Sequence, residues 1–480
     1  MTADLAKQLG DLQTCLNIVW TLVTGFLVMF MQAGFALVET GLTRARNVAH
    51  TMAMNFLVYA IGILGFWAVG FAFQMGGVGG LSTFGDDPTL SAEAVVHIAG
   101  KEFGLFGLKG FFLSPSVLTP GVAALFLFQL VFMDTAATIP TGAGAERWKF
   151  TSFVLFSFVV SMLIYPVFAN WVWGGGWLSA LGRNCGFGHG YVDFAGSSVV
   201  HMCGGVMAFA VAKTLGPRHG KYDGYGRARA LPGHSVPLVV LGTFILAFGW
   251  FGFNAGSTLA GTETHISVIA TNTMLASGAG PVAAYLYTKI RFGAPDVTMM
   301  CNAMLAGLVA ITAPCAFVTA PSAVLIGAVA GVLVIRSSLF IEQVVKVDDP
   351  VGAISVHGTC GAWGIVALGL LADGRYGQGF NGVGDGVRGL FYGDSGQFAA
   401  QCIGLVANAV WVGGVALGAL WTIGAILGGN RAALQDEIDG LDLAEMGGPG
   451  YAPDVQARET IPPPLPDKAR GHGVVAGQAS

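Results

Sequence analysis

The sequence predicts an all-α protein that crosses a membrane many times, and three observations support this fold class. Only 10% of the 480 residues are charged, against about 25% in a typical soluble domain, and the net charge is −4. Apolar residues make up 54% of the chain, and the mean hydropathy is +0.67. This composition excludes a soluble globular enzyme, a disordered chain and a fibrous repeat, and the weakly negative charge gives no sign of a nucleic-acid partner.

Eleven apolar runs are long enough for a helix to cross about 30 Å of hydrocarbon, which takes about 20 residues. The first follows Asp4, Lys7 and Asp11, with no basic segment and no small-residue cleavage site. We therefore expect this helix to stay in the protein and not to be removed as a signal peptide. In chain order the predicted spans are approximately 16–41, 51–75, 119–141, 149–170, 195–213, 235–255, 264–288, 297–314, 322–341, 351–371 and 396–428.

Basic residues in the connections predict the orientation, because Lys and Arg accumulate on the cytoplasmic side of a membrane. Of the 23 Lys and Arg residues, 17 fall in the connections that share a side with the C-terminus, and six share a side with the N-terminus. We expect the N-terminus outside and the C-terminus inside. Residues 1–428 are then the membrane domain and 429–480 a cytoplasmic tail, whose distal Pro-rich and Gly-rich part is typical of a mobile extension.

An internal repeat connects two of the spans. Residues 193–205 read DFAGSSVVHMCGG and residues 349–361 read DPVGAISVHGTCG, and in both an Asp is followed eight residues later by a His. The copies lie in the fifth and tenth spans, and a unit of five spans inverts the second copy in the membrane. The predicted architecture is a 5+5 inverted repeat, about 16–213 and about 235–371, with a final helix at about 396–428.

The two histidines of the repeat, His201 and His357, are expected near the middle of the membrane. Eight helical residues carry each one about 12 Å inward from its Asp. Two adjacent neutral imidazoles can share a hydrogen bond and pass a proton along it, and ionisable groups at this depth are usually functional. The alternative is a pair of hydrogen-bonded core histidines. Asp349 is expected to cap its helix, while Asp193 could cap its own helix or attract a cation from the outer side.

Several motifs in the right order resemble the signatures of the Amt/Mep ammonium transporters, relatives of the Rhesus proteins. The resemblance covers about 430 residues and is that of a bacterial or archaeal member. It implies a multi-pass transporter of the cell (plasma or inner) membrane rather than an enzyme, a homotrimer with one pore in each protomer, and no cofactor or metal. The motifs are DFAGSSVVHMCGG, WVWGGG (171–176), WFGFNAGS (250–257), AERWKF (145–150) and VDDPVGAISVHGTCG (347–361).

The resemblance also implies which residues form the path. An indole face attracts a cation such as ammonium and a serine hydroxyl accepts a hydrogen bond from it. Below them an apolar lumen would favour deprotonation to ammonia. With 33 Phe and 10 Trp in the chain, any single aromatic residue is otherwise more often packing than a gate. Carried onto this sequence, the residues are the recruitment site Trp173, Ser257, Phe132 and Asp193; the phenyl gate Phe132 and Phe253; and the twin-His pair His201 and His357.

Three features depart from the pattern or leave a choice open. Asp134 lies inside the third span, so it either pairs with something in the bundle or alters conduction; Glu39 in the first span is a familiar variant. The long connection 76–118 covers an outer vestibule or packs at a trimer interface. The basic loop 213–234 is either the positive-inside signal or part of a surface that docks a PII-type signalling protein, as the resemblance implies.

Two other functions compete with transport. The first is an ammonium sensor or transceptor with little conduction, motivated by Asp134 and by the tail GLDLAEMGGPGY (440–451), in which Gly-Gly-Pro interrupts a regulatory tail like that of the family. The second is a haem protein with His201 and His357 as axial ligands. Such a protein would usually carry two His pairs at helical spacing, which this chain lacks.

Overall fold

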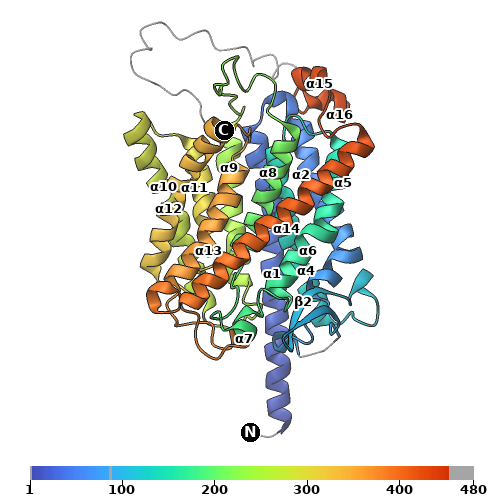
Figure 1. Cartoon of the computed structure of the whole chain (residues 1–480), viewed down its shortest axis with the longest axis vertical. Coiled ribbons are helices and arrows are strands. Elements are labelled where there is room, and N and C mark those ends of the chain that lie inside the picture. The colour runs from blue at the N-terminus through green and yellow to red at the C-terminus, as the bar shows by residue number, and fades with distance from the viewer. Residues whose placement is uncertain (1–2, 86–88, 453–480) are drawn as a thin grey trace.

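Long apolar helices stand side by side and form one bundle (Figure 1). A computed structural model describes residues 3–85 and 89–452. Within these residues, nine helices are long and apolar enough to cross a membrane, which confirms a multi-pass membrane protein. They are Asp4–Leu42, Ala45–Met75, Pro120–Gly144, Phe150–Trp173, Ser197–Leu215, Val236–Ala255, Ala320–Val345, Ile354–Leu371 and Ser395–Leu427.

Most of these helices are built from several consecutive elements. The α-helices are α1 (Ala3–Leu42), α2 (Val48–Gly65), α3 (Phe71–Met75), α4 (Pro120–Gly144), α5 (Phe150–Val159), α6 (Tyr165–Trp173), α7 (Leu181–Cys185), α8 (Cys203–Leu215), α9 (Val236–Trp250), α10 (Ile266–Phe292), α11 (Val297–Ile311), α12 (Ala320–Phe340), α13 (Cys360–Leu371), α14 (Ser395–Leu427), α15 (Leu434–Asp439) and α16 (Leu441–Met446). In the described chain the π-helical segments are η2 (Phe66–Gly70), η5 (Val160–Ile164), η6 (Ser197–Met202), η7 (Phe251–Ala255), η8 (Ile341–Val345) and η9 (Ile354–Thr359).

Local chemistry explains where several helices begin. α4, α9 and α12 follow Thr119, Ser235 and Thr319, whose side-chain oxygens accept hydrogen bonds from first-turn N–H groups, and each has a Pro in its first turn. Asp296 and Asp394 cap α11 and α14 in the same way. A side-chain acceptor pairs a donor that the helix leaves free, and Pro has no N–H to leave unpaired.

Each predicted span coincides with a continuous helical stretch, but two of them miss the length or hydropathy expected of a membrane span. α11 is apolar and has 15 residues. α10 has 27 residues but carries the polar Asn272, whose amide donates to the carbonyl oxygens of Cys315 and Val318 at 2.9 Å. Because these polar groups have partners inside the protein, the helix stands in the bundle without being strongly apolar.

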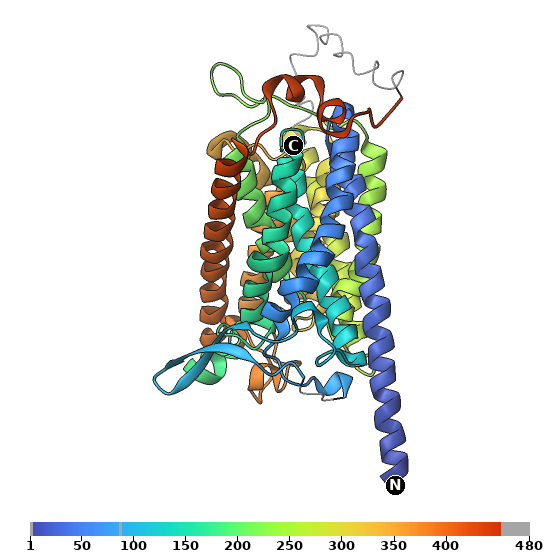
Figure 2. The same cartoon turned by 90° about the vertical axis from the view of Figure 1, so that its right-hand side faces the viewer.

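The first helix begins earlier than the sequence predicts. α1 starts at Ala3 instead of residue 16, and its first turns project beyond the bundle (Figure 2). Charged residues end the apolar run there, but they do not end a helix, because the segment contains no Pro. Leu5, Leu9 and Leu12 are exposed on this projecting part.

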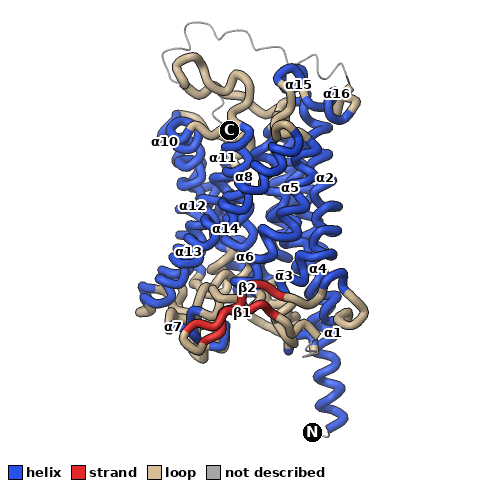
Figure 3. The backbone as a smooth tube through the Cα atoms, turned by 45° about the vertical axis from the view of Figure 1, so that its right-hand side comes forward, coloured by secondary structure: helices blue, strands red, loops and turns tan. Residues whose placement is uncertain are grey.

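The expectation of an all-α protein is wrong in the connection 76–118, which contains a β-hairpin (Figure 3). Strands β1 (Glu93–Ile98) and β2 (Lys101–Gly107) pair antiparallel, with Glu93 opposite Gly107 and a bulge after Ala94. The two-residue turn has positive φ at Ala99 (52°) and Gly100 (75°), as tight hairpin turns require. The carbonyl oxygen of Leu105 accepts a hydrogen bond from the indole of Trp171 at 2.8 Å, which ties the hairpin to α6.

The bundle separates two sets of connections. The start of α1 and the hairpin lie at one end, and α15 and α16 lie at the other (Figures 1 and 3). The backbone N–H groups of His50 and His219 donate to Asp442 at 2.9 Å and to Glu437 at 2.5 Å, so the first part of the tail is docked on the bundle. The predicted distal extension falls in residues 453–480, outside the described residues.

Candidate functional site

Two buried histidines meet in the middle of the bundle. His201 lies in η6 and His357 in η9, and their Nδ1 atoms are 3.2 Å apart. Their rings are nearly parallel, with centroids 5.3 Å apart. The two Nδ1 atoms form a hydrogen bond only if one of them carries a proton and the other does not. The structure thus brings together the two residues that the repeat singled out.

The two halves of the repeat share their local backbone. Each Asp is followed three residues later by a glycine with positive φ, 113° at Gly196 and 80° at Gly352. Each glycine N–H donates to the Asp Oδ1, at 2.9 Å and 3.0 Å. A π-helical segment that contains the histidine then begins within two residues of each glycine. π-Helical turns are rare and occur mostly at functional sites.

Asp193 is a helix cap in this structure. Its side chain is buried, and its two oxygens accept five hydrogen bonds from the residues that begin η6, among them the hydroxyl of Ser198 at 2.7 Å. Of the two roles that the sequence left open for Asp193, this geometry is that of the helix cap. Burial raises the pKa of Asp193, although the hydrogen bonds oppose the shift. Asp349 accepts backbone N–H groups of Val351, Gly352 and Ile354, as expected of a cap.

Glycines allow the two histidine segments to cross closely. Gly205 in α8 packs directly on the backbone of Gly358, the residue after His357. A side chain at Gly205 would overlap the backbone nitrogen of Gly358. Close packing of two helix backbones requires residues without a Cβ at the contact.

Replacing Gly205 by alanine is expected to destabilise the protein, because the added Cβ overlaps the backbone of η9. Overpacking a core typically costs about 1–3 kcal/mol. The measurement is the melting temperature of the detergent-solubilised protein, which should fall. Gly414→Ala in α14 is the control, because a Cβ there has open space around it. Equal melting temperatures for the two variants would contradict the expected close contact.

A row of aromatic rings leads to the histidine pair. The rings of Phe132 and Phe253 stack with centroids 4.1 Å apart, and the Phe253 ring is 5.3 Å from that of His201. On the other side, Trp173 lies edge-on to Phe132 at 6.0 Å. The structure therefore places five of the seven predicted site residues in one continuous series: Trp173, Phe132, Phe253, His201 and His357.

The polar atoms of Trp173 and Ser257 have partners within the protein. The indole N–H of Trp173 donates to the carbonyl oxygen of Asp193 at 2.7 Å. The hydroxyl of Ser257 donates to the carbonyl oxygen of Phe253 at 2.8 Å. The Trp173 ring and the lone pairs of the Ser257 oxygen remain able to accept a cationic donor.

Asp134 has no ionic partner among the described residues. It is 2% exposed, its Oδ1 has no hydrogen-bond partner, and it faces Gly62 of α2. Of the two alternatives that the sequence left open, pairing within the bundle is therefore not seen among the described residues, and an effect on conduction stays a prediction. Residues n and n+2 point about 200° apart around a helix, so Asp134 faces away from the stacked ring of Phe132.

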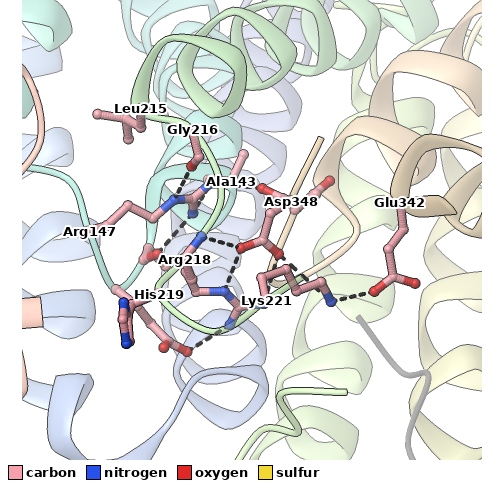
Figure 4. A network of polar contacts seen from close by, with 12 residues as sticks. Ala143, Arg147, Leu215, Gly216, Arg218, His219, Lys221, Glu342 and Asp348 are labelled. Carbon is pink, nitrogen blue, oxygen red and sulfur yellow. Dashed lines mark hydrogen bonds and ion pairs between the residues drawn. The ribbon is translucent and has the colours of Figure 1, made fainter. Parts of the chain in front are cut away.

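A buried ionic network joins three connections at the tail end of the bundle (Figure 4). The guanidinium of Arg218 donates to Asp348 at 2.9 and 3.0 Å and to Glu146 at 3.0 Å. Lys221 pairs with Glu342, and Arg147 donates to the Asp348 carbonyl oxygen at 2.7 Å. The AERWKF and VDDP motifs contain several of these residues, but no role was predicted for them.

Mutual attraction sets the ionisation of this network. Burial alone would raise the pKa of Asp348 and Glu146, but the guanidinium of Arg218 lowers both below their ordinary values. Burial alone would lower the pKa of Arg218, and the same two carboxylates raise it above its ordinary value. Burial lowers the pKa of Arg147 to about 10. All of these groups are therefore charged near neutral pH.

The fold and the site define a multi-pass helical membrane protein in which a row of aromatic rings ends at a buried pair of histidines. The sequence model of the Ammonium Transporter Family matches residues 19–451. The chain belongs to this family, which confirms the resemblance seen in the sequence.

Individual relatives support the same family membership. The chain is 46% identical over 437 residues to ammonium transporter Amt2 of Archaeoglobus fulgidus, covering 91% of this chain and 88% of the relative. It is 37% identical to ammonium transporter Amt1 of Haloferax mediterranei, covering 90% and 78%. A solved structure described as "Sensor Amt Protein" superposes with a TM-score of 0.78 at 33% identity, covering 91% of this chain and 99% of that one. Candida albicans Mep2 superposes with 0.73 at 27% identity, covering 94% and 93%.

Proposed function

We propose that this protein carries ammonium across a cell (plasma or inner) membrane. Ammonium is received at Trp173 and Ser257, loses its proton near the Phe132–Phe253 stack, and passes as ammonia along His201 and His357. The proton follows separately through the histidine pair. The supporting observation is the continuous series of rings that ends at two imidazoles 3.2 Å apart.

Physical chemistry favours this sequence of events. A cation over an indole face gains about 0.5–2 kcal/mol, enough to concentrate ammonium without trapping it. An unpaired cation in a narrow apolar lumen costs several kcal/mol, so ammonia with a separated proton is favoured there. Potassium has no proton to lose, and this step excludes it.

The proposed architecture has eleven spans, a 5+5 inverted repeat and a final helix, with the N-terminus outside and the tail inside. It comprises a membrane domain (1–428) and a cytoplasmic tail (429–480). The matched capping of the two histidine segments and the gathering of buried Arg and Lys at the tail end support it. We also propose a homotrimer, with a PII-type protein docking on the inner face near the loop 213–234.

Currents on solid-supported membranes test the proposed function. Purified full-length protein in proteoliposomes should give a saturable current on an ammonium concentration jump and none on a potassium jump. Protein-free liposomes are the control. A wild-type protein that is folded but gives no ammonium current would contradict transport.

The second candidate is an ammonium sensor with little conduction, and one solved relative is described as a sensor. It predicts saturable ammonium binding, measured by calorimetry, without a current. A wild-type current would exclude it.

A further inference from the structure

We infer that Glu39 receives the proton that leaves the histidine pair, across a small cavity at the inner end of the path. This inference rests on the proposed function and adds to it a residue that accepts the proton before it reaches the inner solution.

A cavity of about 20 Å³ lies between Glu39 and His357. A cavity can hold a water molecule when it offers about 10–15 Å³ and two to four polar partners. Glu39, His357 and Asn302 provide polar side chains in its wall, and the other lining residues are apolar. The cavity is therefore large enough for a water molecule, and its wall contains both an imidazole and a carboxylate.

The Glu39 carboxylate is held in place by neutral donors. It is 3% exposed and accepts hydrogen bonds from the amide of Asn55 at 2.7 Å and from the hydroxyl of Thr141 at 2.7 and 2.9 Å. No Lys or Arg of the described chain pairs with it. Two oxygens offer about four acceptor positions and three are used, so one remains for a hydrogen bond from a water, along which a proton can arrive.

An acid inside a membrane bundle without a cationic partner is costly, and such residues usually mark proton or ion pathways. Asp193 and Asp349 are explained by the backbone N–H groups that they cap. Glu39 has no such explanation, because α1 continues past it on both sides. Asp134 is also an unpaired acid, but it faces Gly62 and does not line the cavity, whereas Glu39 lines it together with His357.

Of the two histidines, His357 is the one placed to pass a proton toward Glu39. His201 and His357 use their Nδ1 atoms on each other, which leaves Nε2 of each ring for other partners. His357 lines the cavity, whereas His201 is stacked under Phe253. Glu39 lies three residues, or about 4.5 Å along the helix axis, before the end of α1 at Leu42.

The transfer balances without any co-reactant. Protonated His357 gives its N–H proton to the cavity water, and the water gives one of its own protons to the Glu39 carboxylate. Glu39 becomes a neutral acid and then releases the proton to the inner solution. Histidine, water and carboxylate all return to their starting states.

The test compares Glu39→Gln with Asp134→Asn in proteoliposomes. Glutamine keeps an oxygen to accept from Asn55 and Thr141 but cannot accept a proton. General acid–base groups contribute about 10²–10⁴ in rate, so the saturating ammonium current should fall at least about tenfold in Glu39→Gln. The half-saturating concentration should stay unchanged, because the outer site is untouched. Asp134→Asn removes another buried carboxylate and should keep the wild-type current.

Three results would overturn the inference. Glu39→Gln with a wild-type current removes it and leaves the proposed function standing, whereas a wild-type protein without current removes both. Equal losses in Glu39→Gln and Asp134→Asn would assign Glu39 a structural role. If Glu39→Gln does not assemble, Glu39→Asp replaces it: the shortened carboxyl should lower the current and increase its solvent isotope effect in D2O, and an unchanged isotope effect would also overturn the inference.

Discussion

Replacing His201 by aspartate should give a protein that loses its discrimination between ammonium and potassium. An aspartate places a fixed negative charge beneath the Phe132–Phe253 stack, where the wild type has an imidazole that accepts or gives one proton. A carboxylate stabilises any small cation, so potassium gains a binding partner that does not require deprotonation. We expect potassium currents where the wild type has none, measured on solid-supported membranes. His357→Asp should act in the same way.

His201→Asn separates the effect of losing the imidazole from the effect of adding a negative charge. Its amide can still form hydrogen bonds, but it can neither carry a proton nor attract potassium by charge. This variant should lose ammonium current and stay closed to potassium. The relay would be disproved if the two aspartate variants both kept intact ammonium currents and remained impermeable to potassium.

The second large effect is expected from Arg218→Met at the tail end of the bundle. Arg218 is completely buried between Asp348 and Glu146, and methionine would leave both carboxylates without their main counter-charge. Removing one partner of a buried ion pair costs about 3–5 kcal/mol. We expect a large fall in the melting temperature of the solubilised protein and a low yield of assembled protein.

The control for Arg218→Met is a variant that also carries Glu146→Gln and Asp348→Asn. With the three charges removed together, no carboxylate is left without the counter-charge of Arg218, although Arg44 loses its partner Glu146. Part of the stability should therefore return. If Arg218→Met alone melts at the wild-type temperature, the network is not a source of stability.

Much of the path could be predicted from the sequence because it depends on local patterns. Apolar runs revealed the long helices, since a membrane span needs about 20 apolar residues. The repeat paired His201 with His357 although they are 156 positions apart. The roles of Phe132, Phe253 and Trp173 came from the family resemblance and remain predictions, although the structure stacks their rings in series.

Other features could not be predicted from the sequence, because they depend on contacts between distant segments. The ionic network joins Arg218 to Asp348, 130 residues later, and no spacing in the chain indicates that pairing. The choice between the two roles of Asp193 could not be made from the sequence, because a carboxylate at a helix start either faces solvent or turns back onto the helix, and only the backbone decides. The hairpin was missed because the apolar runs that predict membrane spans carry no information about short strands in a connection.

The π-helical segments make this path sensitive to the length of its helices as well as to their residues. His201, Phe253 and His357 all lie in such segments. Deleting one residue from a helix turns everything beyond it by about 100° and moves it about 1.5 Å. A one-codon deletion in η7 would therefore rotate Ser257 away from its neighbours while leaving every site residue in the gene. Relatives that keep all of these residues but lack one helical position would be expected to have a differently shaped path.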